Sequence, residues 1–461
     1  MEKQSTRYKT TCKIILIVIS PIIVVYIAVT AFFCNHLYFK STVNRVNVSC
    51  KSVKEIEEDL PSELNNYVIN IYGRDNKNEQ ITGQQINLRI SDVNKIQEIK
   101  NNQNPFGWFA SLFFKSEYHL SDQIIFDDDL LNKAVDNLSY FKNENIVESQ
   151  NPTLSYDGNA FVITPEINGT RVIKENMLEK IKDSIQNGDS YLNLEDTECY
   201  QNPQFTAESQ NVKDAKDLLN KYIQTKVTYK FGENNETLDG AIISGLLSVD
   251  NNYNVVIDNN KIKQYVKTLG DKYNSVGKSR SFKTTKGSVI NVTGGNYGNM
   301  IDNDKETLAI VDLIKNGQVV EREPEYKQKA ASTDSNDIGN TYLEVDLTDQ
   351  HLWFYKGGNV IVDGDVVSGN VSAGNATPAG VYEVNFKQKD AVLRGANYAS
   401  PVNYWMPFNG GIGLHDASWR STFGGSIYLY NGSHGCVNAP YNLASKVFEN
   451  IEAGTPVVCY Y

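Results

Sequence analysis

The sequence has few cysteines and histidines and no close-spaced pair of cysteines. Among 461 residues there are 6 cysteines and 5 histidines. No CxxC pair occurs, which disfavours zinc ribbons and thioredoxin-like redox sites. The scattered thiols do not form a disulfide framework, and nothing in the spacing supports a pairing of Cys50 with Cys199. Basic residues are also in the minority, with 44 Lys and Arg against 55 Asp and Glu and a net charge of −11. Without a basic block we expect no nucleic-acid partner.

One long apolar run lies near the N-terminus. Residues 14–34 are apolar apart from Ser20 and Thr30, and about 20 such residues can cross a hydrocarbon core of ~30 Å. The run is longer than the apolar region of a signal peptide, and bulky aromatic residues follow it, so an uncleaved anchor is favoured over a cleaved signal. Basic residues precede it, which predicts a cytoplasmic tail at 1–13 and the remaining chain outside. The expected localisation is the cell membrane, as a single-pass protein.

The residues after the apolar run are polar and then repetitive. Residues 35–105 are rich in Asn, Lys and Glu, which predicts a stalk or a poorly packed region. FGWFASLFF at 106–114 is too short to span a membrane, so a core segment is favoured, with a patch near the bilayer as the alternative. Segment 161–188 then matches 290–317 without a gap. Both copies contain strand-like alternation, a glycine, helical i, i+4 spacing and a final Asn-Gly that is typical of a helix C-cap.

This repeat predicts two α+β units upstream of a third domain. Apolar residues further upstream recur at a similar offset, namely Leu131, Val135 and Leu138 against Ile262, Val266 and Leu269. We therefore expect repeat 1 over 106–205 and repeat 2 over 206–328. Neither contains a constellation of Cys, His and acid, so binding or spacing is expected of them. A charged and then Ser-, Asp- and Asn-rich stretch at 321–340 indicates a flexible linker, placed at 329–340.

Residues 341–461 predict a compact β-rich domain. TYLEVDL at its start alternates with period two, and Gly357-Gly358 joins two further strand-like runs as in a hairpin. TPAGVYEVNF is a turn that leads into another strand, and one helix is expected at 442–450. The predicted fold class is therefore multidomain: one transmembrane helix, two α+β repeat units and a mostly-β C-terminal domain, either a sandwich or a partly closed barrel.

Two histidines and one cysteine of this domain fall within 22 residues. A cysteine needs a nearby base at neutral pH, because its ordinary pKa is about 8.5. His434 is too close in sequence to Cys436 for in-line proton transfer along an extended segment. A strand–loop–strand return can bring His415 to Cys436, so His415 is favoured as the base and His434 as an organiser of the site. Gly435 permits the close backbone approach that an oxyanion pocket requires.

Two other interpretations of these residues need to be weighed. A single free cysteine is often only a packed core residue. A zinc site is disfavoured, because His-Gly-Cys is not a usual zinc spacing and a fourth ligand is missing. No metal and no cofactor is expected.

The order of these residues resembles the signature of the L,D-transpeptidase catalytic domain, also called the YkuD domain. His415 is followed after 17 residues by SHGCVN at 433–438, which fills every fixed position of the family pattern. GIGLH at 411–415 and TPAGVY at 377–382 resemble the strand before the family's histidine and its Thr-Pro-x-Gly turn. More loosely, INGTRV and GGNYGNMID in the two repeats resemble the peptidoglycan-binding modules found upstream in this family.

The resemblance implies a cysteine acyltransferase. Cys436 would be the nucleophile and His415 the general base and later the acid. Backbone N–H groups near Gly435 and Cys436 would form the oxyanion hole. The backbone carbonyl of Asp416 would orient the imidazole, while the Asp416 carboxylate is expected on the solvated surface. The residues that would hold the loop are Ser433, His434 and Asn438.

The implied reaction joins the stem peptides of peptidoglycan. A donor tetrapeptide would acylate the thiol at its third residue, a diamino acid, and the side-chain amine of a second stem would accept the acyl group. The expected partners are these stem peptides and, through the anchor, the cell membrane. Within the family, L,D-carboxypeptidase or protein-to-wall attachment stays open. A non-catalytic wall-binding scaffold is disfavoured by the intact motif, and a papain-like protease by the order of histidine before cysteine.

Overall fold

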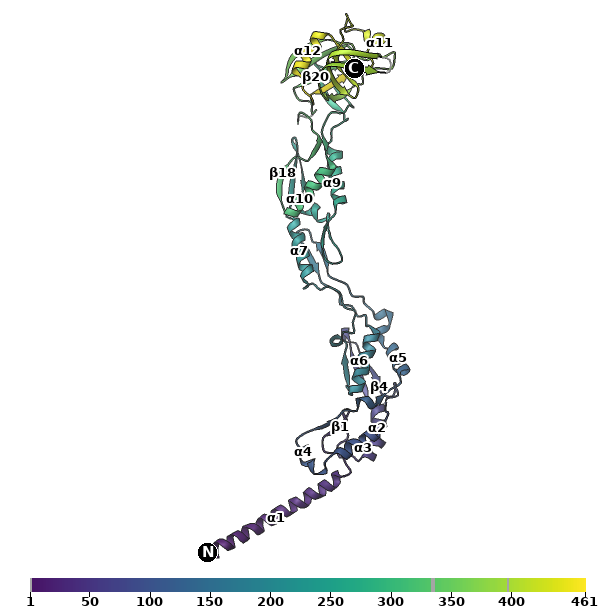
Figure 1. The fold of residues 1–461 in the computed structure, drawn as a ribbon, viewed down its shortest axis with the longest axis vertical. Helices are drawn as coiled ribbons and strands as arrows, with labels where there is room; N and C mark the ends of the chain where they lie inside the picture. The colour runs from purple at the N-terminus through teal and green to yellow at the C-terminus, as the bar shows by residue number, and fades with distance from the viewer. Residues whose placement is uncertain (1, 333–335, 396–397) are drawn as a thin grey trace. The chain divides into compact units, whose positions relative to one another are not determined.

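The computed structural model describes residues 2–332, 336–395 and 398–461, and their side chains from residue 17 onward except at Ser121 and Tyr398. Two compact units form (Figure 1). Unit 1 consists of Met1–Thr153 and Thr164–Ser209, and unit 2 consists of Leu154–Ile163 and Gln210–Tyr461. Unit 1 contains repeat 1 except residues 154–163, whereas unit 2 contains those residues, repeat 2 and the C-terminal domain.

Helix α1 (Glu2–Phe33) corrects the predicted membrane anchor at 14–34. In the part of the chain described with its side chains, no helix is both long enough and apolar enough to cross a membrane. The last turns of α1 pack within unit 1 instead: Trp108 Nε1 donates to Thr30 Oγ1 at 3.1 Å, and Phe33 is fully buried. A membrane span needs about 20 apolar residues that face lipid. The last turns of α1 face other residues of unit 1 instead. The predicted transmembrane helix and single-pass membrane localisation are therefore wrong, and the membrane as a partner loses its basis.

Residues 35–105, expected to be a stalk, are folded into the core of unit 1. Helix α2 (Val53–Asn65) buries one face through Ile56, Leu60 and Leu64, which recur at the i, i+4 spacing of an amphipathic helix. Ser52 and Glu55 form a capping box at its N-terminus. The other elements of this region are β1 (Ser41–Val43), β2 (Val46–Asn47), β3 (Val68–Tyr72), β4 (Asn78–Thr82), β5 (Arg89–Ile90) and α3 (Asn94–Asn102). Cys50 and Cys199 are free thiols and do not pair.

The aromatic run at 106–114 is buried at only part of its length. Trp108 and Ser111, both in α4 (Trp108–Ser111), are buried. The four phenylalanines of the run are more than half exposed: Phe106, Phe109, Phe113 and Phe114. The core interpretation therefore applies to Trp108 and not to the phenylalanines.

The two repeats contain sheets of the same topology. In the orders β10-β3-β4 and β12-β11-β18, the central strand pairs in parallel with one neighbour and antiparallel with the other. Because repeat 1 uses β3, it begins before the boundary expected at 106. The remaining strands of these sheets are β10 (Tyr191–Asn193), β11 (Lys226–Phe231), β12 (Asn234–Leu238) and β18 (Val319–Arg322).

The helices that follow the matched glycines end as the repeat pattern predicts. Helix α6 (Lys174–Asn187) ends at Gly188 with φ of 70°, and α10 (Asn303–Asn316) ends at Gly317 with φ of 64°. Glycine adopts this left-handed conformation without a Cβ penalty, which makes it a common helix C-cap. Helices α9 and α10 of repeat 2 are in contact (Figure 1). The other elements are β6 (Ser116–Tyr118), β7 (Ile124–Ile125), α5 (Asp128–Asp136), α7 (Gln210–Tyr222), α8 (Gly240–Ser244), β13 (Leu247–Val249), β14 (Val255–Ile257), α9 (Asn259–Tyr273), β17 (Met300–Ile301) and β19 (Tyr326–Gln328).

A hairpin from repeat 1 belongs to the core of repeat 2. Strands β8 (Thr153–Tyr156) and β9 (Phe161–Thr164) pair with each other, and residues 154–163 are part of unit 2. Phe161 is buried among the apolar residues of repeat 2, and its N–H donates to Asn220 Oδ1 at 2.7 Å. The sequence boundary between the repeats is thus not their structural boundary.

The corresponding hairpin of repeat 2 packs on the C-terminal domain. It consists of β15 (Arg280–Lys283) and β16 (Val289–Val292). Its apolar residues Phe282 and Val292 share a buried cluster with Val381 and Val458 of the C-terminal domain. The two domains are therefore joined by an apolar interface as well as by the chain between them.

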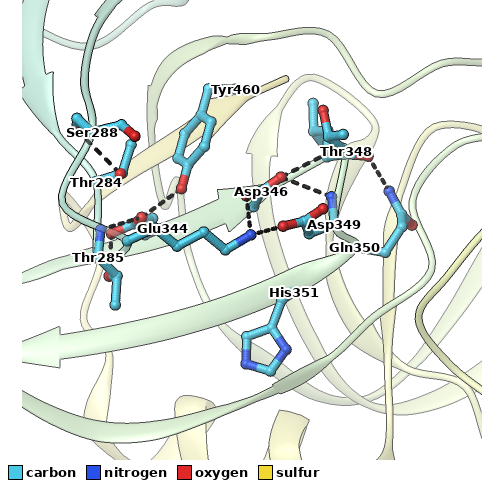
Figure 2. A network of polar contacts seen from close by, with 12 residues as sticks. Thr284, Thr285, Ser288, Glu344, Asp346, Thr348, Asp349, Gln350, His351 and Tyr460 are labelled. Atoms are coloured by element: carbon cyan, nitrogen blue, oxygen red, sulfur yellow. Dashed lines mark hydrogen bonds and ion pairs between the residues drawn. The ribbon is translucent and has the colours of Figure 1, made fainter.

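Polar contacts at the turn of this hairpin seal the interface (Figure 2). Glu344 is fully buried, and its carboxylate accepts hydrogen bonds from Thr285 N (2.9 Å), Thr285 Oγ1 (2.7 Å) and Tyr460 Oη (2.6 Å). Lys286 Nζ pairs with Asp346 at 2.9 Å and also with Asp349. A buried carboxylate is costly without such partners, so these contacts favour one fixed docking of the hairpin.

The predicted linker at 329–340 is not a flexible tether in its described part. Ala330 and Ile338 are buried in the same apolar cluster as the hairpin. Ala331 N–H donates to Tyr297 Oη at 2.8 Å, and Tyr297 Oη donates to Asp337 O at 2.7 Å. The composition indicates a solvated chain, but the apolar side chains of Ala330 and Ile338 pack in the cluster.

Gly295→Ala should weaken this interface. Gly295 has φ of +88°, and a Cβ there would lie 1.9 Å from Val381 O. Gly287→Ala is a matched control, because Gly287 has φ of +89° with nothing within 4 Å of its Cβ position. We expect the Gly295 variant to unfold roughly 5–10 °C below the control in thermal denaturation. Equal midpoints for the two variants would contradict a tight approach of the two domains.

The C-terminal domain is a β-sandwich with an apolar core between its two sheets. One sheet has the order β22-β21-β20-β28-β23 and the other β24-β25-β26-β27. Buried residues from both sheets form the core, among them Phe354 and Val457 from the first and Met406 and Leu414 from the second. The strands are β20 (Tyr342–Asp346), β21 (His351–Lys356), β22 (Asn359–Asp365), β23 (Gly380–Glu383), β24 (Gln388–Gly395), β25 (Tyr398–Asn409), β26 (Ile412–Asp416), β27 (Val437–Ala439) and β28 (Pro456–Tyr460).

The predicted multidomain architecture with a mostly-β C-terminal domain agrees with this structure. The expected hairpin turn at Gly357-Gly358 has positive φ at both residues, 58° and 82°, as a tight two-residue turn requires. Helix α12 (Tyr441–Asn450) nearly coincides with the helix expected at 442–450, and α11 (Ile427–Asn431) precedes the SHGC segment. Figure 1 shows both helices beside the strands of this domain.

Candidate active site

Two parallel strands bring the separated parts of the motif together. In β26 and β27, His415 lies opposite Asn438 and Leu414 lies opposite Val437. Residues opposite each other in a pair of strands share one face of the sheet, so His415 and Asn438 lie on the same face, and Cys436 lies in the bend directly before β27. All three residues line one cleft of about 210 Å³.

His415 is buried and held in one orientation. Its Nδ1 donates to the backbone carbonyl of Asp416 at 2.8 Å, which is the contact that the family resemblance implies. This bond places the proton on Nδ1 and leaves Nε2 with a lone pair that can accept a proton. The rings of Trp405 and Trp419 each lie 5.9 Å from the imidazole, centroid to centroid. Burial lowers the pKa of His415, the Arg420 charge lowers it further, and the Asp416 contact opposes both.

Cys436 is half-buried beside β26, the strand that carries His415. Its Sγ–H donates to Gly411 O at 3.6 Å, within the range for a sulfur donor. Burial raises the pKa of the Cys436 thiol, and a backbone hydrogen bond with Gly413 opposes that rise. With a lowered pKa on His415 and a raised pKa on Cys436, the resting pair is a neutral thiol and a neutral imidazole at pH 7.

The loop before Cys436 is fixed by three side-chain contacts. Ser433 Oγ accepts from Gly435 N at 3.0 Å and donates to Cys436 O at 2.5 Å. Thr377, fully buried, donates from Oγ1 to Gly435 O at 2.7 Å. Gly435 has φ of +121°, a conformation that L side chains rarely adopt. His434 is exposed and lines the cleft. In the part of the chain with described side chains, no group of three or more potential metal ligands occurs.

The Asp416 carboxylate is not on the solvated surface, contrary to expectation. Its residue is 1% exposed, and its two oxygens accept from Asn403 Nδ2 and from Tyr404 N, both at 2.8 Å. The strand pairing of β25 with β26 explains this burial, because it places Asp416 against the neighbouring backbone. A second buried polar group, Asn438 Oδ1, has no hydrogen-bond partner among the described residues and lines the cleft.

Several residues that line the cleft or contact its residues were not predicted from the sequence. Thr377 was noted only as part of a turn motif, although its place in the Thr-Pro-x-Gly sequence was a usable signal. Trp405, Trp419 and Arg420 carry no spacing relation to Cys436. Only the pairing of β25 with β26 and the turn after β26 bring them to the site.

Comparisons with known proteins identify two kinds of domain in this chain. The family model of the L,D-transpeptidase catalytic domain, YkuD, matches residues 340–459. A model described as a putative peptidoglycan binding domain matches residues 80–192 and 205–321. No curated protein gives a significant match.

Solved structures give three informative relatives. The crystal structure of a cysteine-to-serine mutant of the Enterococcus faecium L,D-transpeptidase is 38% identical, covering 53% of this chain and 98% of that chain, with a TM-score of 0.46. The carbamoyl enzyme of Ldtfm with avibactam is 37% identical, covering 54% and 99%, with a TM-score of 0.47. The E. faecium catalytic domain acylated by ertapenem, solved by NMR, is 46% identical, covering 26% and 97%, with a TM-score of 0.25.

By these sequence matches the chain belongs to the L,D-transpeptidase family. Its function is that of a peptidoglycan L,D-transpeptidase, an enzyme of the acyltransferase type whose substrate is peptidoglycan.

Proposed function

We propose that this enzyme links the third residues of two stem peptides through a thioester on Cys436. The observation that carries the proposal is that Cys436, directly before β27, and His415, in the parallel neighbour β26, line one cleft. A thiol, a base with a free Nε2 and backbone donors at one site are the groups that acyl transfer requires.

In the first step the donor stem acylates the enzyme. His415 Nε2 accepts the thiol proton while Sγ attacks the carbonyl carbon of the donor's third residue. Because Gly435 N–H already donates to Ser433, the Cys436 N–H is the principal donor to the oxyanion. The tetrahedral intermediate then breaks its C–N bond to the terminal D-alanine, whose nitrogen takes the proton from His415. A thioester on Cys436 remains.

In the second step an amine replaces the sulfur. The side-chain amine of the diamino acid in a second stem attacks the thioester carbonyl and gives a proton to His415 Nε2. The C–S bond breaks, the thiolate recovers that proton, and an amide joins the two third residues. Asp416 supports both steps, because its backbone carbonyl holds Nδ1 and its buried carboxylate favours the imidazolium that forms in between.

Mass spectrometry of the products from purified tetrapeptide muropeptides tests this reaction. We expect a cross-linked dimer that has lost one D-alanine. Accumulation of tripeptide monomers alone would indicate an L,D-carboxypeptidase instead. Transfer only to an added protein amine would indicate attachment of proteins to the wall. Enzyme treated beforehand with iodoacetamide is the control, and it should yield none of these products.

A carbapenem should form a covalent adduct on Cys436. The thiol can attack the strained β-lactam carbonyl in the same cleft and open the ring at its C–N bond. The related E. faecium domain is described as acylated by ertapenem. Intact-protein mass spectrometry should show one added carbapenem per chain and none on Cys436→Ala protein. Cys34 is an exposed free thiol, so Cys34→Ala protein should still be acylated. An adduct that disappears in the Cys34 variant would show mere thiol reactivity and contradict the proposed site.

A further inference from the structure

Arg420 lies in the catalytic cleft but has no role in the chemistry described above. A turn after β26 positions it, with Arg420 N donating to Ala417 O at 3.0 Å. Its half-buried side chain lines the cleft that holds Cys436 and His415. It also lines an adjoining hollow of about 350 Å³.

The charge of Arg420 is not matched by any carboxylate of the described residues. Nη1 donates to the backbone carbonyl of Asn431 at 2.8 Å, while Nε is buried without a hydrogen-bond partner. Elsewhere in unit 2, the half-buried Arg322 pairs with Glu306 and the buried Arg280 pairs with Asp337. An unmatched guanidinium in a concave site is a strong binder of a ligand carboxylate, because its planar fork can donate two parallel hydrogen bonds.

The guanidinium is also close enough to the reacting groups to affect them. Its positive charge contributes to the lowered pKa of His415. In a donor tetrapeptide the free carboxylate lies one residue beyond the attacked carbonyl, and one residue spans about 3.3–3.6 Å of extended chain. In a stem with a further residue, that position is a neutral amide instead.

We propose that Arg420 binds the terminal carboxylate of the donor stem and thereby selects donors that end one residue after the attacked carbonyl. This inference rests on the proposed function, since it assumes acylation of Cys436 at the donor's third residue. Arg420 is a positioning residue that holds the leaving group, so its effect belongs to the donor step.

The test compares two donors with three forms of the full chain. The donors are a tetrapeptide with a free terminal carboxylate and the same peptide with a terminal amide. The forms are the unmodified chain, Arg420→Met and the control Arg394→Met. Arg394 is exposed on β24, the strand that pairs with β25, and it does not line the cleft. Release of the terminal residue without acceptor amine gives kcat/KM for the donor step.

We expect the unmodified chain to use the free carboxylate roughly 10- to 100-fold better than the amide, as for a hydrogen bond between charged groups. For Arg420→Met, kcat/KM should fall by that factor with the free carboxylate and change little with the amide. For Arg394→Met, kcat/KM should match that of the unmodified chain with both donors. Equal losses on both donors would mean a structural role and overturn the inference.

Two further outcomes distinguish donor binding by Arg420 from acceptor binding and from failure of the proposed function. If Arg420→Met leaves donor release unchanged but alters the division of thioester between water and acceptor amine, Arg420 binds an acceptor carboxylate and the donor assignment is overturned. If the unmodified chain releases the terminal residue from neither donor, although iodoacetamide still alkylates Cys436, the proposed function itself is wrong. Iodoacetamide is neutral and has no carboxylate that Arg420 could bind, so its reaction with the unmodified chain reports whether the thiol is reactive without any donor recognition.

Discussion

Cys436→Ala should reduce cross-link formation by roughly 10⁴-fold or more, to the background of the assay. The variant lacks the only sulfur among the described residues that line the cleft. Folding should be nearly unaffected, since Cys436 is half-buried at the edge of a small apolar cluster and loses one atom. The measurement is dimer formation from tetrapeptide muropeptides, with circular dichroism to confirm the fold.

Cys459→Ala is the matched control for this variant. Cys459 is fully buried in β28, and burial raises its pKa to about 12, so it is chemically silent at neutral pH. Its replacement should lower stability by about 1–3 kcal/mol through the cavity it leaves and keep the activity at low temperature. Full cross-linking by the Cys436 variant would falsify the nucleophile assignment.

His415→Gln should lower the acylation rate by roughly 10²- to 10⁴-fold, the usual contribution of a positioned general base. It should also change the pH dependence. The pKa of His415 is lowered from its ordinary value of 6.5 by burial. Acylation by the unmodified chain should therefore hold through pH 7 and fall only in acid, where the imidazole binds a proton. This acid limb should be absent in His415→Gln, which retains a side chain that can hydrogen-bond but not titrate.

His434→Ala is the comparison that assigns the base. His434 is exposed and two residues from Cys436, so its loss should act on the loop and leave the acid limb in place. The alkylation rate of Cys436 by iodoacetamide, measured against pH in both variants, distinguishes the two histidines. An acid limb that disappears with His434 and persists without His415 would exchange their roles.

The parts of the site that sequence reasoning located are those that the chain places in short, ordered motifs. The spacing of His415 and SHGCVN predicted a return between strands, and the pairing of His415 with Asn438 has that form. The period-two strands and helix α12 of this domain were predictable for the same reason: each depends on residues that are neighbours in the chain.

The remaining features depend on residues far apart in the sequence. The sequence around Asp416 does not indicate that Asn403 and Tyr404 contact its carboxylate. The predicted exposure of this carboxylate was therefore wrong. The apolar run at 14–34 has the composition of a membrane span, but only the fold shows its last turns against Trp108. Arg420 is likewise ordinary in sequence and acquires its position from a turn.

The forward-reaching hairpins impose an order on the domains. The hairpin at 154–163 presents apolar residues suited to the core of repeat 2, whereas the hairpin of β15 and β16 presents Thr285 and Lys286 to the acidic residues of the sandwich. The two hairpins differ in what they present, because the second carries Lys286, which pairs with Asp346 and Asp349, in addition to its apolar residues. Each module therefore encodes which module can follow it, and a shuffled or duplicated arrangement would have to evolve a new hairpin together with the new neighbour.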